Sequence, residues 1–325
     1  MPSASRSAAA GISLKKATLI YNPIAGRRPV RREREIRRAA RVLQGAGIEV
    51  ALAPTTRPGE ATDLTRAAVV RGVDLILGCG GDGTINEVIN GLAPGQTPLG
   101  ILPGGTANIL ARELLLPQSP VAAARELQNW SPRRIALGRA RWGNGVNLPR
   151  GGEPVADFAC RYYASVAGIG FDAQIVYKLS SRLKMGLGVA GYVVEAFRQL
   201  MRYTFPKFTW RANGAEREAT FAVVHRTRLY AGWLHLAPTA GLFQPHLVVC
   251  SFPSSSRARY LLYALAVLTR QHLHLADVKL EPGTEVFCAP PADALPVRFE
   301  LDGELVGALP ATFEIVPDAL TLLVP

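Results

Sequence analysis

Cysteine is scarce in this 325-residue chain, and the four cysteines stand far apart. They are Cys79, Cys160, Cys250 and Cys288, so the sequence contains neither a CxxC redox motif nor a zinc ribbon. The fold must therefore be stabilised by its apolar core and not by disulfides or a structural metal. Hydrophobic residues make up 48% of the chain, which is enough for such a core. Such sparse, unpaired cysteine is typical of a reducing cytoplasm.

Long apolar runs are absent as well. The best candidate, Tyr260–Leu268, is too short for the about 18 residues of a membrane span, and Arg259 and Arg270 bracket it. We interpret this run as one buried face of a helix. Residues 1–14 lack the apolar core of a signal peptide and are expected to form a loose tail.

Acidic residues are outnumbered, 25 against 37 basic ones, which leaves a net charge of +12. Half of this excess lies between Arg27 and Arg41, where eight arginines accompany two glutamates. A solvated helix face is the ordinary explanation of such a cluster. Attraction to phosphate, nucleic acid or an anionic membrane is the alternative, and charge alone does not choose among these partners.

Apolar strands alternate with amphipathic helices over the first 130 residues. This alternation predicts a parallel sheet with helices on its faces. Strands are expected at 17–21, 48–53, 73–79 and 98–102, and helices at 31–44, 60–71, 84–92 and 106–115.

Beyond Trp130 the β signals dominate, and Asn213-Gly214 is a strong hairpin signal between strands at 208–211 and 219–224. We predict a mostly antiparallel β domain with helices inserted near 189–201 and 257–273. The chain therefore divides into a tail (1–14), an α/β domain (15–132) and a β domain (133–325). The last strand is expected to pack back on the first domain.

The most informative segment is Gly80–Val88, with the sequence GGDGTINEV, which follows an apolar strand and opens a helix. Its glycines let the backbone turn sharply and approach a ligand. Thr84 and Glu87 have the spacing of a capping box, with Thr84 as the N-cap. A helix N-terminus with free N–H groups is a site for phosphate. The carboxylate of Asp82 in this site indicates either a divalent cation bridging it to a nucleotide or a nearby cation that it neutralises.

Two further loops repeat this logic. Leu99–Asn108 (LGILPGGTAN) joins a strand, a glycine pair and a threonine at a helix start. Asn22–Gly26 (NPIAG) follows the first strand, and Thr55 follows the second. Because the carboxyl ends of parallel strands meet at one edge of a sheet, we expect these loops to line one nucleotide site.

Together these motifs resemble the diacylglycerol kinase catalytic family, which includes bacterial lipid kinases and is similar to sphingosine and ceramide kinases. The motifs GGDGTINEVINGL, LPGGTAN and NPIAG are joined by GIGFDA at Gly168–Ala173 and LDGE at Leu301–Glu304, so the resemblance spans nearly the whole chain. GGDGT alone is shared with NAD kinases. Its extension to NEVINGL, together with GTAN, favours lipid kinases.

The resemblance implies an N-terminal α/β domain that binds ATP and a C-terminal β-sandwich that binds lipid, with the active site in the cleft between them. It implies Mg²⁺ and transfer of the γ-phosphoryl group of ATP to a lipid hydroxyl. Glu304 is implied to be the general base, although Asp302-Gly303 by itself indicates only a hairpin turn. Asp82 is expected to act beside it and to hold Mg²⁺ with ATP. The residues implied to bind ATP are Asn22, Pro23, Gly26, Thr55, Gly80, Gly81, Asp82, Gly83, Thr84, Ile85, Asn86, Glu87, Gly105, Thr106 and Asn108.

Three positions depart from the family pattern, which often has acidic residues there. They are Ile109 after GTAN, Ala136 in the first strand after the domain junction, and Gln244 in the second domain. These losses put a secondary, structural Mg²⁺ in doubt. They are also compatible with a divergent substrate or a weakened enzyme.

We therefore expect an ATP-dependent lipid kinase that is cytoplasmic, peripheral to the inner face of the membrane and without a nucleic-acid partner. The sequence leaves open whether the protein forms a homodimer. It also leaves open which lipid accepts the phosphoryl group: diacylglycerol, monoacylglycerol, phosphatidylglycerol, sphingosine or ceramide. Arg31, Arg34 and Arg38 are expected to hold the protein on anionic lipid. The alternatives are a kinase of a soluble acceptor, similar to NAD kinases, and a catalytically weak protein that binds lipid or nucleotide.

Overall fold

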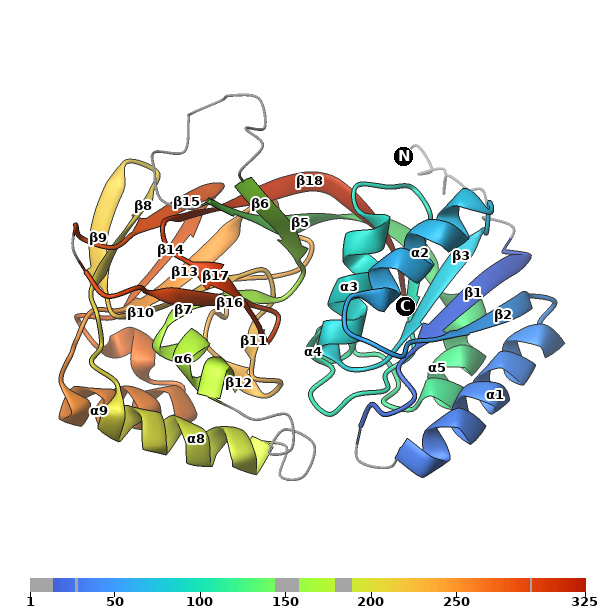
Figure 1. Ribbon diagram of the computed structural model, residues 1–325, viewed down its shortest axis with the longest axis horizontal. Coiled ribbons are helices and arrows are strands. Elements are labelled where there is room, and N and C mark those ends of the chain that lie inside the picture. The colour runs from blue at the N-terminus through green and yellow to red at the C-terminus, as the bar shows by residue number, and fades with distance from the viewer. Residues whose placement is uncertain (1–13, 27–28, 144–157, 179–188, 293) are drawn as a thin grey trace, which may run out of the picture.

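The structure is a computed structural model that describes residues 14–26, 29–143, 158–178, 189–292 and 294–325. Figure 1 shows two domains side by side, joined along the top by two long strands. The first is an α/β domain with a parallel sheet, and the second is an antiparallel β-sandwich, so the predicted fold class is confirmed. None of the described helices is long and apolar enough to cross a membrane.

The first domain is built on four parallel strands in the order β2-β1-β3-β4. All five residues of β3 are buried, because helices cover both faces of a parallel sheet. The strands are β1 (Lys16–Tyr21), β2 (Glu49–Pro54), β3 (Leu75–Cys79) and β4 (Leu99–Ile101). The helices are α1 (Pro29–Gly45), α2 (Glu60–Val70), α3 (Asp82–Leu92), α4 (Ile109–Glu113), α5 (Pro120–Glu126) and the 3₁₀ turn η1 (Leu127–Asn129).

A ribbon of two long antiparallel strands, β5 (Ser131–Gly143) and β18 (Ala311–Val324), runs through both domains. The last residues of β18 extend the parallel sheet, with Leu322 beside Leu99 of β4. Its first residues pair with β15 in the second domain. One ten-stranded sheet therefore crosses the whole molecule, and the expected boundary at 132/133 falls inside β5.

The second domain packs this sheet against a six-stranded one, with a core of large aromatic side chains between them: Tyr163, Phe208, Trp210, Phe299 and Phe313. On the first sheet lie β6 (Phe158–Tyr163), β8 (Phe208–Ala212), β9 (Ala215–Ala219) and β15 (Glu285–Ala289). On the second lie β7 (Val166–Gly170), β10 (Phe221–His225), β13 (Leu247–Phe252), β14 (Lys279–Gly283), β16 (Arg298–Leu301) and β17 (Glu304–Ala308).

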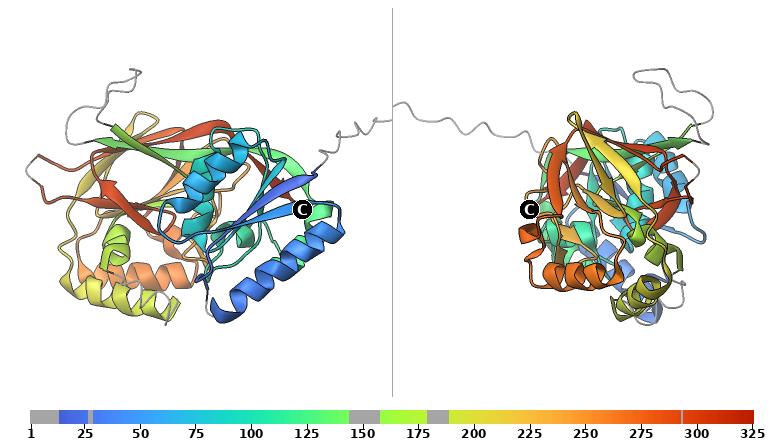
Figure 2. Two further views of the ribbon diagram at one scale, coloured as in Figure 1. Left: turned by 45° about the vertical axis from the view of Figure 1, so that its right-hand side comes forward. Right: turned by 90° about the vertical axis from the view of Figure 1, so that its left-hand side faces the viewer.

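Helices and a small hairpin cover one end of the sandwich. Figures 1 and 2 show α8 and α9 along the lower edge of the second domain in every view. The elements are α6 (Phe171–Lys178), α8 (Val189–Arg202), α9 (Arg257–Leu268), the 3₁₀ turn η2 (His272–His274), and the strands β11 (Leu229–Tyr230) and β12 (Leu234–His235).

Three local predictions were wrong in part. Asn213-Gly214 is a hairpin turn, but its second strand is β9 rather than 219–224. The helix expected at 106–115 shortens to α4, because Asn108 has left-handed backbone (φ 49°) and delays its start. The run Tyr260–Leu268 is helical, but it buries Tyr260 and Tyr263 and exposes its leucines.

Candidate functional site

The GGDGTIN loop connects β3 to α3, which begins at Asp82 with Gly81 as its N-cap. No side chain caps this helix, so the predicted capping box is wrong. Thr84 instead lies in the first turn, where its buried side chain packs so closely on Gly80 that a Cβ at that glycine would collide with it. Gly80 is therefore required by packing within the loop. The next residue, Ile85, is also buried and donates its N–H to Gly81.

Glu87 serves a different helix from the one predicted. Its carboxylate accepts the backbone N–H groups of Gly59 (2.8 Å) and Ala61 (3.0 Å) at the start of α2. A carboxylate at a helix N-terminus satisfies free N–H groups and complements the helix dipole. Glu87 therefore ties α2 to α3, and its carboxylate is directed at α2.

The two glycine-rich loops pack backbone against backbone. Gly104 donates its N–H to the carbonyl of Gly80 (3.2 Å), and a Cβ at Gly105 would collide with Gly81. Asn108 closes its own loop by accepting the N–H of Gly105 (2.8 Å). Glycine is needed at these positions because a side chain would separate the loops.

Asp82 joins the same two loops through its carboxylate, which accepts the N–H groups of Asn108 (3.1 Å) and Ile109 (2.7 Å). Burial raises the pKa of Asp82 to about 6, against the lowering effect of these two hydrogen bonds. Thr106, between the loop glycines and Asn108, is exposed. The structure thus places Asp82, Asn108 and Thr106 together at the carboxyl ends of β3 and β4.

The NPIAG loop lies at the same edge of the sheet. Asn22 donates its N–H to the carbonyl of Cys79 (3.0 Å) and accepts the N–H of Ile24 (3.0 Å), which turns the chain through Pro23. Gly26 has left-handed backbone (φ 81°). Thr55 is buried and donates its N–H to Tyr21 at the end of β1 (2.9 Å).

Arg32 was not singled out from the basic cluster, but it points inward. It donates to the carbonyls of Gly104 (2.6 Å) and Ala25 (3.3 Å), and it pairs with Glu35 (3.0 Å). One buried guanidinium thus links NPIAG to LPGGTAN. In the sequence it cannot be distinguished from its arginine neighbours, because only the packing of α1 turns it inward.

Glu304 reaches the GGDGTIN loop from the second domain. Its Oε2 accepts a hydrogen bond from Arg161 (2.6 Å), and its Oε1 lies over Gly83, where an added Cβ would collide with it. Arg161 also donates to Oδ1 of Asn86 (2.6 Å), so one guanidinium holds the helix and the carboxylate. Arg161 was missed by sequence reasoning, because it lies outside every motif.

Asp302 and Asn86 form a buried link between the domains. Asp302 accepts the N–H groups of Ala164 (2.9 Å), Ser165 (2.8 Å) and Val166 (3.0 Å), and also the side-chain amide of Asn86 (2.8 Å). Burial raises the pKa of Asp302, although these bonds favour its charged form. The amide of Asn86 is therefore engaged in holding the LDGE turn against α3.

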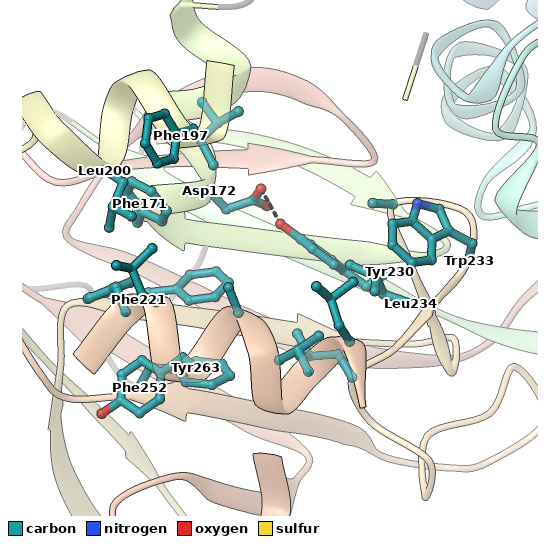
Figure 3. Close-up of a pocket in the computed structure, with 18 residues that line it drawn as sticks. Phe171, Asp172, Phe197, Leu200, Phe221, Tyr230, Trp233, Leu234, Phe252 and Tyr263 are labelled. Carbon is teal, nitrogen blue, oxygen red and sulfur yellow. Dashed lines mark hydrogen bonds between the residues drawn. The ribbon is translucent and has the colours of Figure 1, made fainter. Parts of the chain in front are cut away.

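An apolar cavity of about 350 Å³ lies in the second domain, bounded by α6, α8, α9 and the β11–β12 hairpin. Figure 3 shows aromatic side chains around it and one polar contact, in which Tyr230 donates its hydroxyl to Asp172. Trp233 lies on the same hairpin and is 44% exposed. A mostly apolar cavity with one polar corner is typical of a site for a hydrophobic ligand.

Glu300 connects this corner to the LDGE turn. Its carboxyl group hydrogen-bonds Asp172 and accepts the N–H groups of Gly168 (2.9 Å) and Gly303 (2.5 Å). Burial and the neighbouring Asp172 raise the pKa of Glu300 well above its ordinary value. A continuous chain of bonds therefore runs from the cavity to the residue next to Glu304.

The residues present fit a Mg²⁺ carried by ATP. Asp82 offers a carboxylate beside the two glycine-rich loops, and Mg²⁺ is commonly held by one or two carboxylates together with phosphates and water. Within the described part of the chain, no group of three His, Cys, Asp or Glu side chains could hold a metal ion.

The residues present do not fit a second, structural Mg²⁺. Ile109 and Ala136 offer no side-chain oxygen, and the carbonyls of Ala136 (3.1 Å) and Gln244 (3.0 Å) accept hydrogen bonds from Arg226. Arg226 is fully buried and also donates to the carbonyls of Leu242 and His246 (2.7 Å each). The guanidinium of Arg226 thus engages the backbone oxygens at two of the three departing positions.

Three exposed arginines of the basic cluster, together with Glu35, line a groove between α1 and α5. Its cationic lining consists of Arg31, Arg34, Arg38 and Arg125. Within the described part of the chain, none of these four has a carboxylate within ion-pair distance. Arg27 and Arg28 lie outside the described residues.

Comparisons with known proteins agree with this architecture. The family model "Diacylglycerol kinase catalytic domain" matches residues 16–140, and "YegS C-terminal NAD kinase beta sandwich-like domain" matches residues 165–324. The diacylglycerol kinase of Bacillus subtilis (strain 168) is 30% identical over 308 residues, which cover 92% of this chain and 93% of that one. That of Staphylococcus aureus (strain bovine RF122 / ET3-1) is 27% identical over 304 residues, covering 92% and 89%.

Solved structures share the fold. A crystal structure from Bacillus anthracis str. Sterne covers 99% of both chains with a TM-score of 0.76 at 21% identity. A second, of a diacylglycerol kinase from the same organism, covers 96% of this chain and 98% of that one with a TM-score of 0.68 at 18% identity.

Proposed function

Because the chain belongs to the diacylglycerol kinase family, we propose that it transfers the γ-phosphoryl group of ATP to a hydroxyl group of a lipid. The observation that carries this proposal is the position of Glu304 over Gly83. It brings a carboxylate of the second domain to the loop that would hold the phosphates. A base and a phosphate site in contact are what phosphoryl transfer to an alcohol requires.

The nucleotide would bind at the edge where NPIAG, GGDGTIN and LPGGTAN meet. The glycine loops present backbone N–H groups without side chains, and the start of α3 adds the positive end of a helix dipole. When bound with ATP, Mg²⁺ would neutralise phosphate charge beside Asp82. Because Asp82 also holds Asn108 and Ile109, it would keep both loops in one arrangement.

Glu304 would accept the proton of the lipid hydroxyl as the phosphoryl group arrives. Its side chain is 38% exposed, so it stays accessible to an acceptor. The ion pair with Arg161 orients the carboxylate and leaves Oε1 on the side of the nucleotide loop. Arg161 is a positioning residue in this mechanism.

The apolar cavity beside Asp172 suits the hydrocarbon part of a lipid, and the buried links through Glu300 run from it toward Glu304. Diacylglycerol, monoacylglycerol, phosphatidylglycerol, sphingosine and ceramide each combine an apolar chain with a hydroxyl group. A soluble acceptor such as NAD is the second candidate, since the matched sandwich domain is described as similar to that of NAD kinases. Its polar surface would find little to bind in this cavity.

The test is transfer of labelled phosphate from ATP to a panel of these lipids and NAD. Glu304→Gln should lower kcat by about 100-fold with little change in KM for ATP, since general bases contribute about that factor or more. Glu281→Gln is the matched control, because Glu281 is likewise paired with an arginine, Arg217, and lies far from the loops. Equal rates for the two variants, or transfer to NAD alone, would contradict the proposal.

A further inference from the structure

Helix α9 directs its leucines toward solvent and its tyrosines into the protein, whereas an ordinary amphipathic helix buries its aliphatic side chains. Leu261, Leu262, Leu265 and Leu268 are 53%, 40%, 59% and 57% exposed, and we call these four the leucine face. The inner side of the helix instead buries Tyr260, Tyr263 and Ala266. Several large aliphatic side chains exposed together on one helix indicate an interaction surface.

Polar contacts of the tyrosines fix this orientation. The hydroxyl of Tyr260 lies 2.7 Å from Oγ1 of Thr220, and that of Tyr263 donates to Asp277. Asp277 also pairs with Arg259 in the first turn of the helix. Turning the leucines inward would break these bonds and leave buried hydroxyl groups unsatisfied. The exposure of the leucines is therefore built into the packing of α9.

The leucine face is continuous with the mouth of the apolar cavity. Leu261 and Leu268 line the cavity and are also exposed, as is Phe197 of α8 at 61%. Val194 and Met201, at 50% and 56% exposure, extend the apolar surface along α8. A ligand that entered the cavity from this side would pass between apolar side chains at every step.

Exposed charge on α9 is positive and lies at the two ends of the helix. No charged residue occurs between Arg259 and Arg270, and the exposed Arg257 and Arg270 stand at the two ends of α9. On α8, Arg198 and Arg202 are exposed, and Arg198 lies between the exposed Phe197 and Met201. Helices that lie in a membrane interface have this pattern, with an apolar face toward the acyl chains and cationic residues at the level of the headgroups.

We propose that the leucine face docks on an anionic lipid bilayer, with α9 in the plane of the interface and the cavity open to the membrane. The occupant is a bilayer, because the face leads into an apolar cavity and its margins complement anionic headgroups. In Figures 1 and 2 the N-terminal end of α1 reaches the same lower edge of the molecule. That the lipid acceptor enters the cavity from the membrane through this face rests on the proposed function.

Vesicle binding without ATP tests the docking separately from the reaction. The probe is co-sedimentation with vesicles of phosphatidylcholine containing phosphatidylglycerol. Leu265→Glu should weaken binding about tenfold, because it removes an inserted aliphatic group and adds a charge that anionic headgroups repel. Leu262→Glu should act in the same direction, and neither residue lines the cavity.

Val70→Glu is the matched control, since Val70 is 88% exposed at the end of α2 in the first domain. It should bind vesicles like the wild type, and thermal melts should show all three variants folded. Equal binding of Leu265→Glu and Val70→Glu would overturn the proposal. So would a wild-type dimer, seen by light scattering, that Leu265→Glu dissociates without any loss of vesicle binding. Docking by an inactive protein would contradict only the proposed function.

Discussion

At the scale of single residues, the pair Asp172 and Glu300 has a consequence for pH. Two carboxyl groups can share a hydrogen bond only if one proton lies between them, and Asp172 already accepts the hydroxyl of Tyr230. Both carboxyl groups are buried, and burial beside Asp172 raises the pKa of Glu300 well above its ordinary value, so we assign the proton to Glu300. Asp172, Asp302 and the N–H groups of Gly168 and Gly303 are the groups that face it.

We predict that Glu300→Gln changes how stability depends on pH. In the wild type, unfolding releases the proton of Glu300 at any pH above the ordinary glutamate pKa of about 4.3 and below its raised folded value. Stability due to this group therefore falls as pH rises through that window. Glutamine cannot titrate, so the melting temperature of the variant relative to wild type should increase from pH 4 to pH 7.

Calorimetric melts across this range provide the measurement. Glu285→Gln, at an exposed position on β15, should keep a constant difference from the wild type. A constant difference for Glu300→Gln as well would show that Glu300 ionises normally in the folded protein. That result would contradict the proposal that Glu300 and Asp172 share a proton.

At the scale of elements, the inner and outer sides of helix α1 have different surroundings. Its inner side contributes Ile36, Ala39 and Leu43 to the core, and Arg32 reaches the NPIAG and LPGGTAN loops. Its outer arginines line the groove with α5, away from those loops' carbonyls. We therefore expect that membrane binding through the outer arginines of α1 can be changed without changing the binding of ATP.

We predict that Arg34→Gln combined with Arg38→Gln weakens binding to anionic vesicles without abolishing ATP binding. Each arginine near an anionic surface contributes about 1 kcal/mol, so the pair should change the binding constant by more than tenfold at low salt. The effect should shrink at physiological salt, where the screening length is about 8 Å. Co-sedimentation gives the first quantity and calorimetric titration with ATP the second.

Arg66→Gln combined with Arg71→Gln removes the same charge from the exposed side of α2 and serves as control. Vesicle binding that falls equally in both double variants would mean that net charge alone matters. Binding that is insensitive to salt and to anionic lipid would reduce the groove to a solvated helix face. Membrane contact would then rest on the leucine face.

At the scale of the whole molecule, the β5–β18 ribbon makes the two domains one mechanical unit. Its residues belong to both hydrophobic cores, as Leu320 in the first and Phe313 in the second illustrate. Arg226 fastens the ribbon to the sandwich by bonding Ala136 of β5 and the chain before β13. Burial lowers the pKa of Arg226 to about 10, which leaves it cationic at neutral pH.

We predict a single cooperative unfolding transition, and a loss of about 3 kcal/mol or more for Arg226→Met, since four carbonyls lose their donor. Arg228→Met is the control, because Arg228 is half-exposed and bonds only Glu113 among the described residues. Scanning calorimetry measures both. Two resolved transitions in the wild type would contradict the rigid ribbon, and a wild-type melting temperature for Arg226→Met would mean that its hydrogen bonds do not stabilise the fold.

Mg²⁺ without nucleotide should leave the melting temperature of the wild type unchanged.

The sequence by itself determined the fold class, the family and the positions of the three loops NPIAG, GGDGTIN and LPGGTAN. Strand–helix alternation and glycine spacing are local properties, and the backbone geometry of a tight loop leaves few residues that fit it. Glu304 was singled out only through the family resemblance of the LDGE motif. The sequence also predicted the Asn213-Gly214 turn, because turn chemistry depends on two adjacent residues.

Only the tertiary structure decided what the side chains do. Glu87 caps α2 instead of α3, Arg32 turns inward while Arg34 turns outward, and Arg161 joins Asn86 to Glu304. Sequence patterns could not predict these roles, because each depends on a partner that is distant in the chain and on the rotation of a helix about its axis. The leucine face has the same origin: hydrophobicity alone would bury those leucines, and the tyrosine hydroxyls, once bonded to Thr220 and Asp277, turn the helix the other way.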